Sequence, residues 1–209
     1  MNAALDTADV ERAIAAALGA PVCVAIAYLD TVAGAADEHA LGRVALARAL
    51  AAAGRGDEPV TRWPCPFASV SHSRGLAVAV ALPRAHAVRG LGVDVELDRP
   101  VRPGLAGVFC DARERAWLEA QPACGRDAAV LQLWTAKEAL YKADAAQGDA
   151  IVAEYAVEVP SLSRGGRGHG RSARLVSLRI GDASLSVALE PEPAPLSEQR
   201  QDDHVAATW

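Results

Sequence analysis

Apolar positions recur along the first part of the chain with two different spacings. Residues 9–18 and 37–53 carry Ala, Leu and Arg at the three- and four-residue intervals of amphipathic helices, and Gly19 and Gly54 follow them as predicted stop signals. Between these helices, residues 22–29 are predicted to form a buried strand. The pattern therefore begins with the order helix, strand, helix.

A segment rich in glycine and proline, residues 54–66, separates these elements from three short apolar runs. The runs cover residues 68–71, 76–82 and 91–97, and two of them are short enough to be adjacent strands. Three residues later the chain reads Pro-Val-Arg-Pro within residues 98–103. Each proline prevents a helix from continuing and biases the preceding residue to an extended conformation, so we predict a hinge there.

The chain beyond this hinge repeats the order of helical segments followed by strands, although no residue-level repeat supports the symmetry. Helices are predicted at 111–119 and 127–143, and strands at 155–159, 173–180 and 184–189. The polar, glycine-rich segment 161–172 is predicted to be a flexible loop without regular structure, and residues 191–209 a disordered tail. We expect an α/β (α+β) fold whose halves are residues 1–98 and 99–190.

Composition narrows the function classes. The chain has 209 residues, a net charge of −5 and 22% charged residues, which is ordinary for a globular protein and argues against nucleic acid as a partner. A local basic pocket for one phosphorylated ligand is compatible with this charge.

The cysteines and the first residues bear on the compartment. Cys23, Cys65, Cys110 and Cys124 show no metal-site spacing and are interpreted as free thiols in a reducing environment. The first residues carry acidic side chains and lack the basic start and apolar run of a signal peptide, and no apolar stretch reaches about 18 residues. We expect a cytoplasmic protein without a membrane partner.

The first chemical signal is the strand sequence Gly-Val-Asp-Val-Glu at residues 92–96. Alternate strand residues share a face, so Asp94 and Glu96 are expected to point the same way, with Val93 and Val95 directed into the core. Two adjacent carboxylates suit Mg²⁺, which commonly takes one or two protein carboxylates. A solvated strand face carrying two acids is the alternative.

The second signal is the helical segment 134–142, Trp-Thr-Ala-Lys-Glu-Ala-Leu-Tyr-Lys. Glu138 and Lys142 lie four residues apart on one face, so they could form an ordinary surface ion pair. Alternatively, Glu138 supplies a third carboxylate to the same metal, and Lys142 points at the negative charge of a bound phosphate.

The third signal is the polar run Ser-Val-Ser-His-Ser at residues 69–73. It is not the nucleophile elbow of a hydrolase, and no third member of a catalytic triad is indicated. Ser71, His72 and loop amides could instead hold a phosphate, or the segment could be only a polar turn.

The three signals together resemble the surfactin-type 4'-phosphopantetheinyl transferases. That family is marked by an S-H-S segment, a G-[IV]-D-[IV]-E strand and a W-x-x-K-E-[AS]-x-x-K helix, which residues 69–73, 92–96 and 134–142 match almost letter for letter. Phe109, Glu114 and Trp117-Leu118 resemble a further stretch of the family, and the spacing of Pro59, Trp63 and Pro64 resembles its enterobactin-associated branch.

The resemblance implies an enzyme that transfers 4'-phosphopantetheine from coenzyme A to a serine of an apo acyl or peptidyl carrier protein, releasing adenosine 3',5'-bisphosphate. It implies Mg²⁺ held by Asp94, Glu96 and Glu138, with Glu138 or Lys142 handling the serine proton. Coenzyme A would be bound by Ser71, His72 and Lys142, with Arg48 and Arg62 as further candidates. The family's fold implies two halves related by a pseudo-twofold axis, the site in the cleft between them and a monomeric protein.

Two departures from the family pattern accompany the resemblance. Glu58 stands where many relatives have lysine, with Arg55 or Arg62 as candidate substitutes, and Ala143 to Gly148 replace the usual glycine-rich continuation. Two other readings remain open: a catalytically impaired homologue that binds coenzyme A or carrier, and a metal-dependent phosphohydrolase. The Lys-Glu-Ala form leans towards polyketide-type over nonribosomal-peptide carriers in secondary metabolism.

Overall fold

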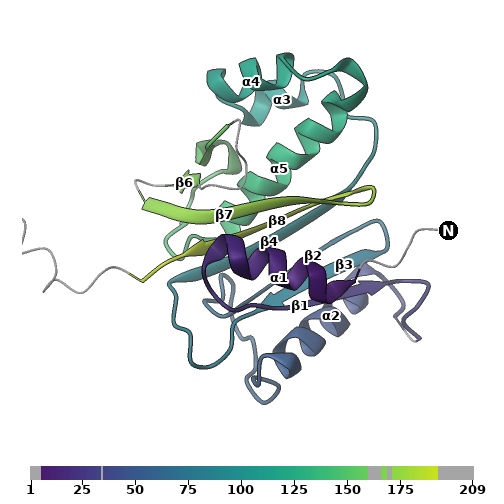
Figure 1. The fold of residues 1–209 in the computed structure, drawn as a ribbon, viewed down its shortest axis with the longest axis vertical. Coiled ribbons are helices and arrows are strands. Elements are labelled where there is room, and N and C mark those ends of the chain that lie inside the picture. Colours follow the sequence, from purple (N-terminus) through teal and green to yellow (C-terminus); the bar gives the residue numbers. More distant parts are fainter. Residues whose placement is uncertain (1–5, 34, 160–165, 169–170, 193–209) are drawn as a thin grey trace, which may run out of the picture.

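The computed structural model describes residues 6–33, 35–159, 166–168 and 171–192 (Figure 1). Every helix and strand predicted before the hinge is present. These elements are α1 (Thr7–Leu18), β1 (Cys23–Tyr28), α2 (Glu38–Ala52), β2 (Ala68–Ser73), β3 (Leu76–Ala81) and β4 (Gly90–Leu97). Gly19 ends α1 in the left-handed conformation, with φ 59°, which confirms the predicted stop.

The predicted helices and strands beyond the hinge are also present among the described residues, although the strand predicted at 155–159 covers only residues 156–157. One short α-helix, two 3₁₀ helices and a three-residue strand were not predicted. The elements are α3 (Leu105–Phe109), α4 (Ala112–Glu119), η1 (Ala123–Gly125), α5 (Arg126–Ala143), η2 (Val152–Glu154), β5 (Ala156–Val157), β6 (Gly166–Gly168), β7 (Arg171–Ile180) and β8 (Ala183–Glu190). The mixed helix and sheet content agrees with the predicted α/β (α+β) class, whereas the pseudo-twofold relation stays a prediction.

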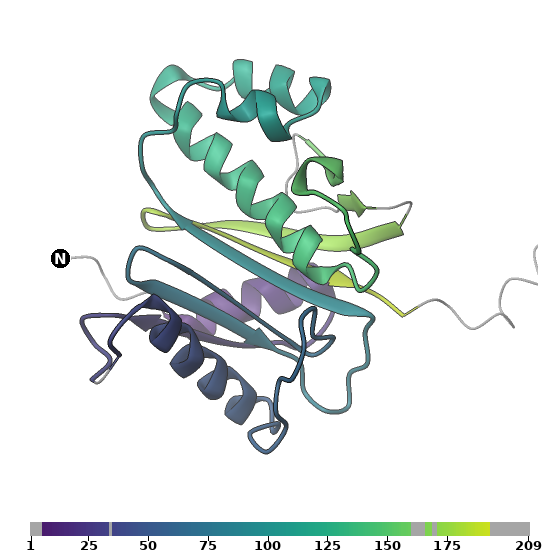
Figure 2. The same cartoon turned by 180° about the vertical axis from the view of Figure 1, so that it is seen from behind.

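The strands form two antiparallel sheets. The first has the order β1-β3-β2 and the second the order β4-β8-β7-β6-β5. Strand β4 precedes the predicted boundary at residue 98 and nevertheless pairs with β8, so that Asp94 lies opposite Ser186. Figures 1 and 2 show α5 above the second sheet, the first sheet below it and α2 at the opposite end of the molecule. The division at residue 98 stays a prediction.

One hydrophobic core joins the two sheets. Helix α1 contributes Val10, Ile14 and Leu18, which recur every four residues and pack with apolar side chains of β1 and β3 from one sheet and β4, β7 and β8 from the other. Alanines on the opposite face of β1 and β3 pack against α2, and α5 covers the second sheet with its own apolar cluster. Residues from both predicted halves therefore contribute to the same core.

The prediction that residues 161–172 lack regular structure is wrong for part of that segment. Strand β6 and the first residues of β7 lie in it, because pairing with β5 and with each other satisfies their backbone groups. Gly166 approaches α5 so closely that a Cβ there would lie 2.4 Å from Cδ1 of Leu140. The remaining residues, 161–165 and 169–170, and residues 193–209 of the predicted tail lie outside the described residues.

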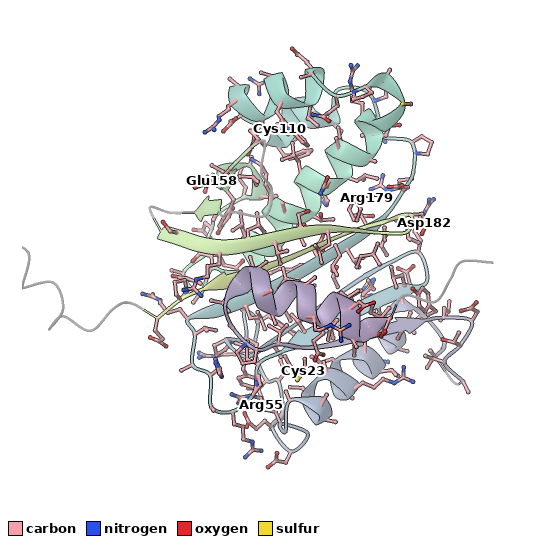
Figure 3. All side chains as sticks on the ribbon, viewed as in Figure 1. Cys23, Arg55, Cys110, Glu158, Arg179 and Asp182 are labelled. Carbon is pink, nitrogen blue, oxygen red and sulfur yellow. The ribbon has the colours of Figure 1, made fainter. Side chains whose placement is uncertain are left out.

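The structure bears on two further predictions, one about membrane-spanning helices and one about the cysteines. Within the described ranges, no helix is both long and apolar enough to cross a membrane. All four cysteines are free, as predicted: Cys65 and Cys110 are buried, Cys23 is half-buried and Cys124 is exposed. Figure 3 labels Cys23 and Cys110.

Candidate functional site

Strand β4 presents its acidic residues on one face, as predicted. Val93 and Val95 point into the core and are 0% and 2% exposed, whereas Asp94 and Glu96 lie on the face that meets α5 and β2. Glycine allows the close approach of α5 to this face: a Cβ on Gly92 would lie 2.0 Å from the carbonyl oxygen of Ala139. The helix therefore rests directly on the strand backbone beside the carboxylates.

Serine side chains of β2 connect the first sheet to β4. Ser69 Oγ accepts a hydrogen bond from the amide of Val93 at 3.0 Å. Ser71 Oγ donates to Oδ1 of Asp94 at 2.7 Å, and Ser73 Oγ donates to Oε2 of Glu96 at 2.8 Å. The serines of the predicted polar run thus hold the edges of the two sheets together at the acidic residues.

Helix α5 brings the third motif to the same place. Lys142 Nζ donates to Oδ1 of Asp94 at 2.7 Å and to the carbonyl oxygen of Val93 at 3.3 Å, and lies 3.4 Å from Ser71 Oγ. Lys142 therefore forms an ion pair across the fold, with a residue of another motif. Segments that are far apart in the sequence meet at one point.

The three carboxylates influence one another electrostatically. Burial raises the pKa of Asp94, and Glu96 raises it further, while Lys142 and Ser71 oppose this rise. Burial also raises the pKa of Glu138, and the negative charges of Asp94 and Glu96 add to it against the opposing effect of Lys142. Glu138 is thus close enough to both strand carboxylates to be repelled by them.

The carboxylate oxygens of these three residues are suitable ligands for a divalent cation. Carboxylate oxygens are the ligands that Mg²⁺ prefers, and a cation would relieve the repulsion among Asp94, Glu96 and Glu138. Within the described part of the chain, however, no three His, Cys, Asp or Glu side chains are already arranged as a metal-binding group, and Oδ1 of Asp94 is bonded to Lys142 and Ser71. The three-carboxylate ligand set stays a prediction.

A pocket of about 560 Å³ opens beside Lys142 and Asp94. One face of α2 lines it with residues spaced three or four apart: His39, Gly42, Arg43 and Leu46. Ser71 and His72 of β2 also line the pocket, as does Trp63, which is 53% exposed. Together with Lys142, the basic side chains make this pocket suitable for a ligand that carries phosphate groups.

His72 lies between the two elements that line the pocket. Its Nδ1 is 3.3 Å from Oε2 of Glu38, without the alignment of a hydrogen bond, and its ring meets that of His39 edge to face with centroids 4.9 Å apart. The other carboxylate oxygen of Glu38 accepts from the amide of Gly75 at 2.8 Å. Glu38 is therefore held where it can orient His72.

The predicted arginines lie elsewhere. Arg48 and Arg62 are exposed, and neither is among the side chains that line this pocket. Arg55 serves the fold instead, because it donates to the carbonyl oxygen of Leu82 and to Glu58, both at 2.6 Å (Figure 3). Arg43 was missed: only the packing of α2 against β2 reveals which face of the helix borders the pocket.

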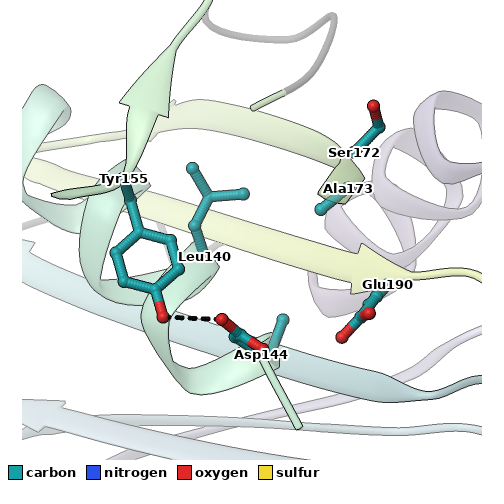
Figure 4. Close-up of a pocket in the computed structure, with 7 residues that line it drawn as sticks. Leu140, Asp144, Tyr155, Ser172, Ala173 and Glu190 are labelled. Atoms are coloured by element: carbon teal, nitrogen blue, oxygen red, sulfur yellow. Dashed lines mark hydrogen bonds between the residues drawn. The ribbon is translucent and has the colours of Figure 1, made fainter. Parts of the chain in front are cut away.

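The segment after Lys142 is anchored by Asp144. Its Oδ1 accepts from the amide of Ala146, and its Oδ2 accepts from the hydroxyl of Tyr155, each at 2.8 Å. Figure 4 shows this pair beside Leu140 and Glu190, around a cavity of about 10 Å³, which is only large enough for a water molecule. The segment that begins at Asp144 is thus held against the body of the protein.

One segment of the chain matches the model of a known protein family. Residues 90–165 match the model of the ACPS family, described as the 4'-phosphopantetheinyl transferase superfamily. The matched segment is just over a third of the chain and includes Asp94, Glu96, Glu138 and Lys142. No curated protein matches the chain. The family match supports the 4'-phosphopantetheinyl transferase superfamily, and with it a transferase of the phosphopantetheinyl type, at the level of one domain within this chain.

Proposed function

We propose that this protein is a surfactin-type enzyme that transfers 4'-phosphopantetheine from coenzyme A to a serine of an apo acyl or peptidyl carrier protein. The observation that carries the proposal is the contact of Lys142 with Asp94 and Ser71 in the lining of the basic pocket. Three motifs that are separate in the sequence meet beside a space of about 560 Å³, which suits a coenzyme with several phosphates.

In the proposed reaction, the serine oxygen of the carrier forms a bond to the pyrophosphate phosphorus nearer the pantetheine. The bond from that phosphorus to the bridging oxygen breaks, and adenosine 3',5'-bisphosphate leaves with the electron pair. Bound Mg²⁺ would neutralise charge on the pyrophosphate oxygens. The protein itself would position the reactants and stabilise the developing charge, because the reaction passes directly from coenzyme A to the serine without a covalent enzyme intermediate.

Glu138 is the proposed acceptor of the serine proton. In the absence of a metal ion, burial and the neighbouring carboxylates raise the pKa of Glu138. A carboxylate oxygen of Glu138 that is not bound to the metal ion would accept the proton. Lys142 would turn from Asp94 towards a phosphate oxygen of the substrate, or share the proton transfer. Asp94 and Glu96, together with Glu138, would then hold the metal ion.

The nucleotide end of coenzyme A is assigned to the basic pocket. Ser71 and His72 would contact its 3'-phosphate, and Arg43 is added because it lines the same pocket. Arg48 and Arg62 remain weaker candidates. We further propose a cytoplasmic monomer with the reaction in the cleft between two related halves, because one chain supplies all the proposed site residues.

The test is intact mass spectrometry of apo carrier proteins incubated with the enzyme, coenzyme A and Mg²⁺, beside a sample with the metal chelated. A metal-dependent gain of one phosphopantetheine group per carrier is expected. Formation of adenosine bisphosphate without carrier would identify a phosphohydrolase instead. Binding of coenzyme A without any gain across acyl and peptidyl carriers would identify an impaired homologue, in which the pairing of Glu58 with Arg55 has replaced a basic contact.

A further inference from the structure

A buried ion pair lies on α5 immediately before Glu138. Lys137 Nζ is 2.8 Å from Oε2 of Glu114, and the two side chains are 1% and 0% exposed. They sit within the apolar cluster that includes Phe109, Leu118 and Leu133. A full pair of charges is thus enclosed in the core of the second half of the chain.

Further hydrogen bonds join this pair to three other elements. Lys137 donates to the carbonyl oxygen of Phe109 at 2.8 Å, at the end of α3. Glu114 accepts from the amide of Asp111 at 2.9 Å, which completes the capping box of α4, and from the amide of Val157 on β5 at 3.0 Å. The pair therefore connects α5 to α3, α4 and β5 at once.

Stability alone is a weak reason for such a pair. Enclosing two charges costs desolvation energy, and well-packed apolar side chains of similar volume are often equally stabilising. A directional contact, in contrast, fixes the orientation of the helix that bears it. Adjacent helical residues project about 100° apart, so an anchor at Lys137 determines where Glu138 points.

Two constraints act on α5 from different sides. The sheet holds it at Gly90 and Gly92, where added Cβ atoms would lie 1.7 Å and 2.0 Å from helix carbonyl oxygens. Glu114 holds the helix through Lys137 from the side of α4. A rotation of the helix by about 10° would move a carboxylate ~6 Å from its axis by ~1 Å, enough to spoil a reactive geometry.

We propose that Glu114 and Lys137 are positioning residues that fix the rotation of α5 and thereby hold the Glu138 carboxylate against Asp94 and Glu96. The inference rests on the proposed function for the role of Glu138. It assigns the lysine of the Trp-Thr-Ala-Lys-Glu segment to the interior of the protein, where it acts through Glu138 and does not touch the substrate.

The test compares wild-type protein with the double variant Glu114→Gln/Lys137→Met, in which both substituted side chains are uncharged and no unpaired charge is left in the core. Mn²⁺ binding is measured by electron paramagnetic resonance, and kcat and KM are measured with coenzyme A and apo carrier. We expect the Kd for Mn²⁺ to rise at least about 10-fold and kcat to fall at least about 10-fold, with KM for coenzyme A within about twofold. Ile14→Val, a core substitution on α1, is the control, and we expect its Kd and its kcat per folded molecule to be unchanged.

A folded double variant with wild-type Mn²⁺ affinity and kcat would overturn the positioning role. If the double variant does not fold, Glu114→Asp decides the question, since it keeps the charge and shortens the side chain by one methylene: a weaker Mn²⁺ affinity supports the inference, and an unchanged one overturns it. Wild-type protein that neither binds Mn²⁺ nor transfers phosphopantetheine would instead contradict the proposed function.

Discussion

Lys142 donates a hydrogen bond to Asp94 across 48 positions of sequence, at 2.7 Å. The ammonium group thereby compensates a carboxylate that is 6% exposed and whose pKa burial raises. A phosphate that attracts Lys142 would leave Asp94 with an uncompensated charge, and a cation could take the place of the ammonium group. Binding of the phosphate and of the metal ion is therefore expected to be mutually favourable.

Removing either of the two central carboxylates is expected to abolish transfer. Asp94→Ala and Glu138→Ala should each lower kcat by at least about 100-fold, because charge stabilisation at the reacting phosphorus is lost. Circular dichroism should show an intact fold, since neither side chain belongs to the apolar clusters. Glu119→Ala, at an exposed position, is the control. Unchanged turnover in either site variant would contradict the metal assignment.

The basic pocket predicts a contrast between two arginines of the same helix. Arg43→Ala should raise KM for coenzyme A by about 10-fold, the effect of losing one charge-assisted hydrogen bond, and His72→Ala should raise KM more than it lowers kcat. Both arginines are exposed, but Arg48→Ala should stay within about twofold of wild type, because Arg48 does not line the pocket. Equal effects of Arg43→Ala and Arg48→Ala in steady-state kinetics would contradict this placement of the coenzyme.

The raised pKa of Glu138 predicts how stability depends on pH in metal-free protein. The folded state binds the proton of the Glu138 carboxyl group more tightly than the unfolded state does. Its contribution to the free energy of unfolding is therefore fully present below the ordinary pKa of 4.5 and is lost as pH rises through the raised pKa of the folded state. Glu138→Gln should remove that loss and gain stability relative to wild type above this window. Thermal unfolding from pH 4 to 8 with a chelator present measures it. Parallel curves for the two proteins would contradict the prediction.

The contact of α5 with β4 predicts a large cost for a single methyl group. Gly92→Ala places a Cβ against helix backbone and should lower the free energy of unfolding by about 3 kcal/mol or more, since neither backbone can yield easily. Gly107→Ala, on α3 with open space around it, is the matched control and should be neutral or slightly stabilising. Urea unfolding of both variants checks the pair; equal stabilities would mean that α5 can move off the strand.

Cysteine reactivity offers a test of the core. Cys124 is exposed and should react with a thiol reagent in the native protein, whereas Cys65 and Cys110 should react only after unfolding. Burial, reinforced by Glu114, raises the pKa of Cys110 to about 12, which further suppresses its thiolate. Peptide mapping after brief alkylation would identify the modified residues. Rapid native labelling of Cys110 would contradict the packing of α4 against α5.

The sequence predicted most helices and strands because their periodicity and their stop signals agree. It also predicted that Asp94 and Glu96 share a face, since alternation in a strand leaves no other arrangement. Arg43 and Arg48 could not be ranked in the same way. Both belong to a helix whose pocket-facing side is decided by contacts with β2, more than 20 positions further along the chain.

Two other features depended on contacts that no local pattern encodes. Strand β6 consists of Gly166 to Gly168, whose composition indicates a loop, and it is ordered by its neighbours in the sheet. Glu114 and Lys137 were each part of a motif, yet their pairing, and hence their burial, required the packing of α4 on α5. Tertiary contacts override local preference in both cases.

Helix α1 packs its apolar residues against strands of both sheets, and this arrangement makes the two predicted halves interdependent. A fragment ending at the hinge would expose the side of α1 and β3 that β7 and β8 cover, and the complementary fragment would lack the strand β4 that borders β8. Neither piece is expected to persist as a folded unit when it is produced alone. Mixing separately expressed fragments, in contrast, could regenerate the whole, because the hinge between them is the single covalent link to be replaced.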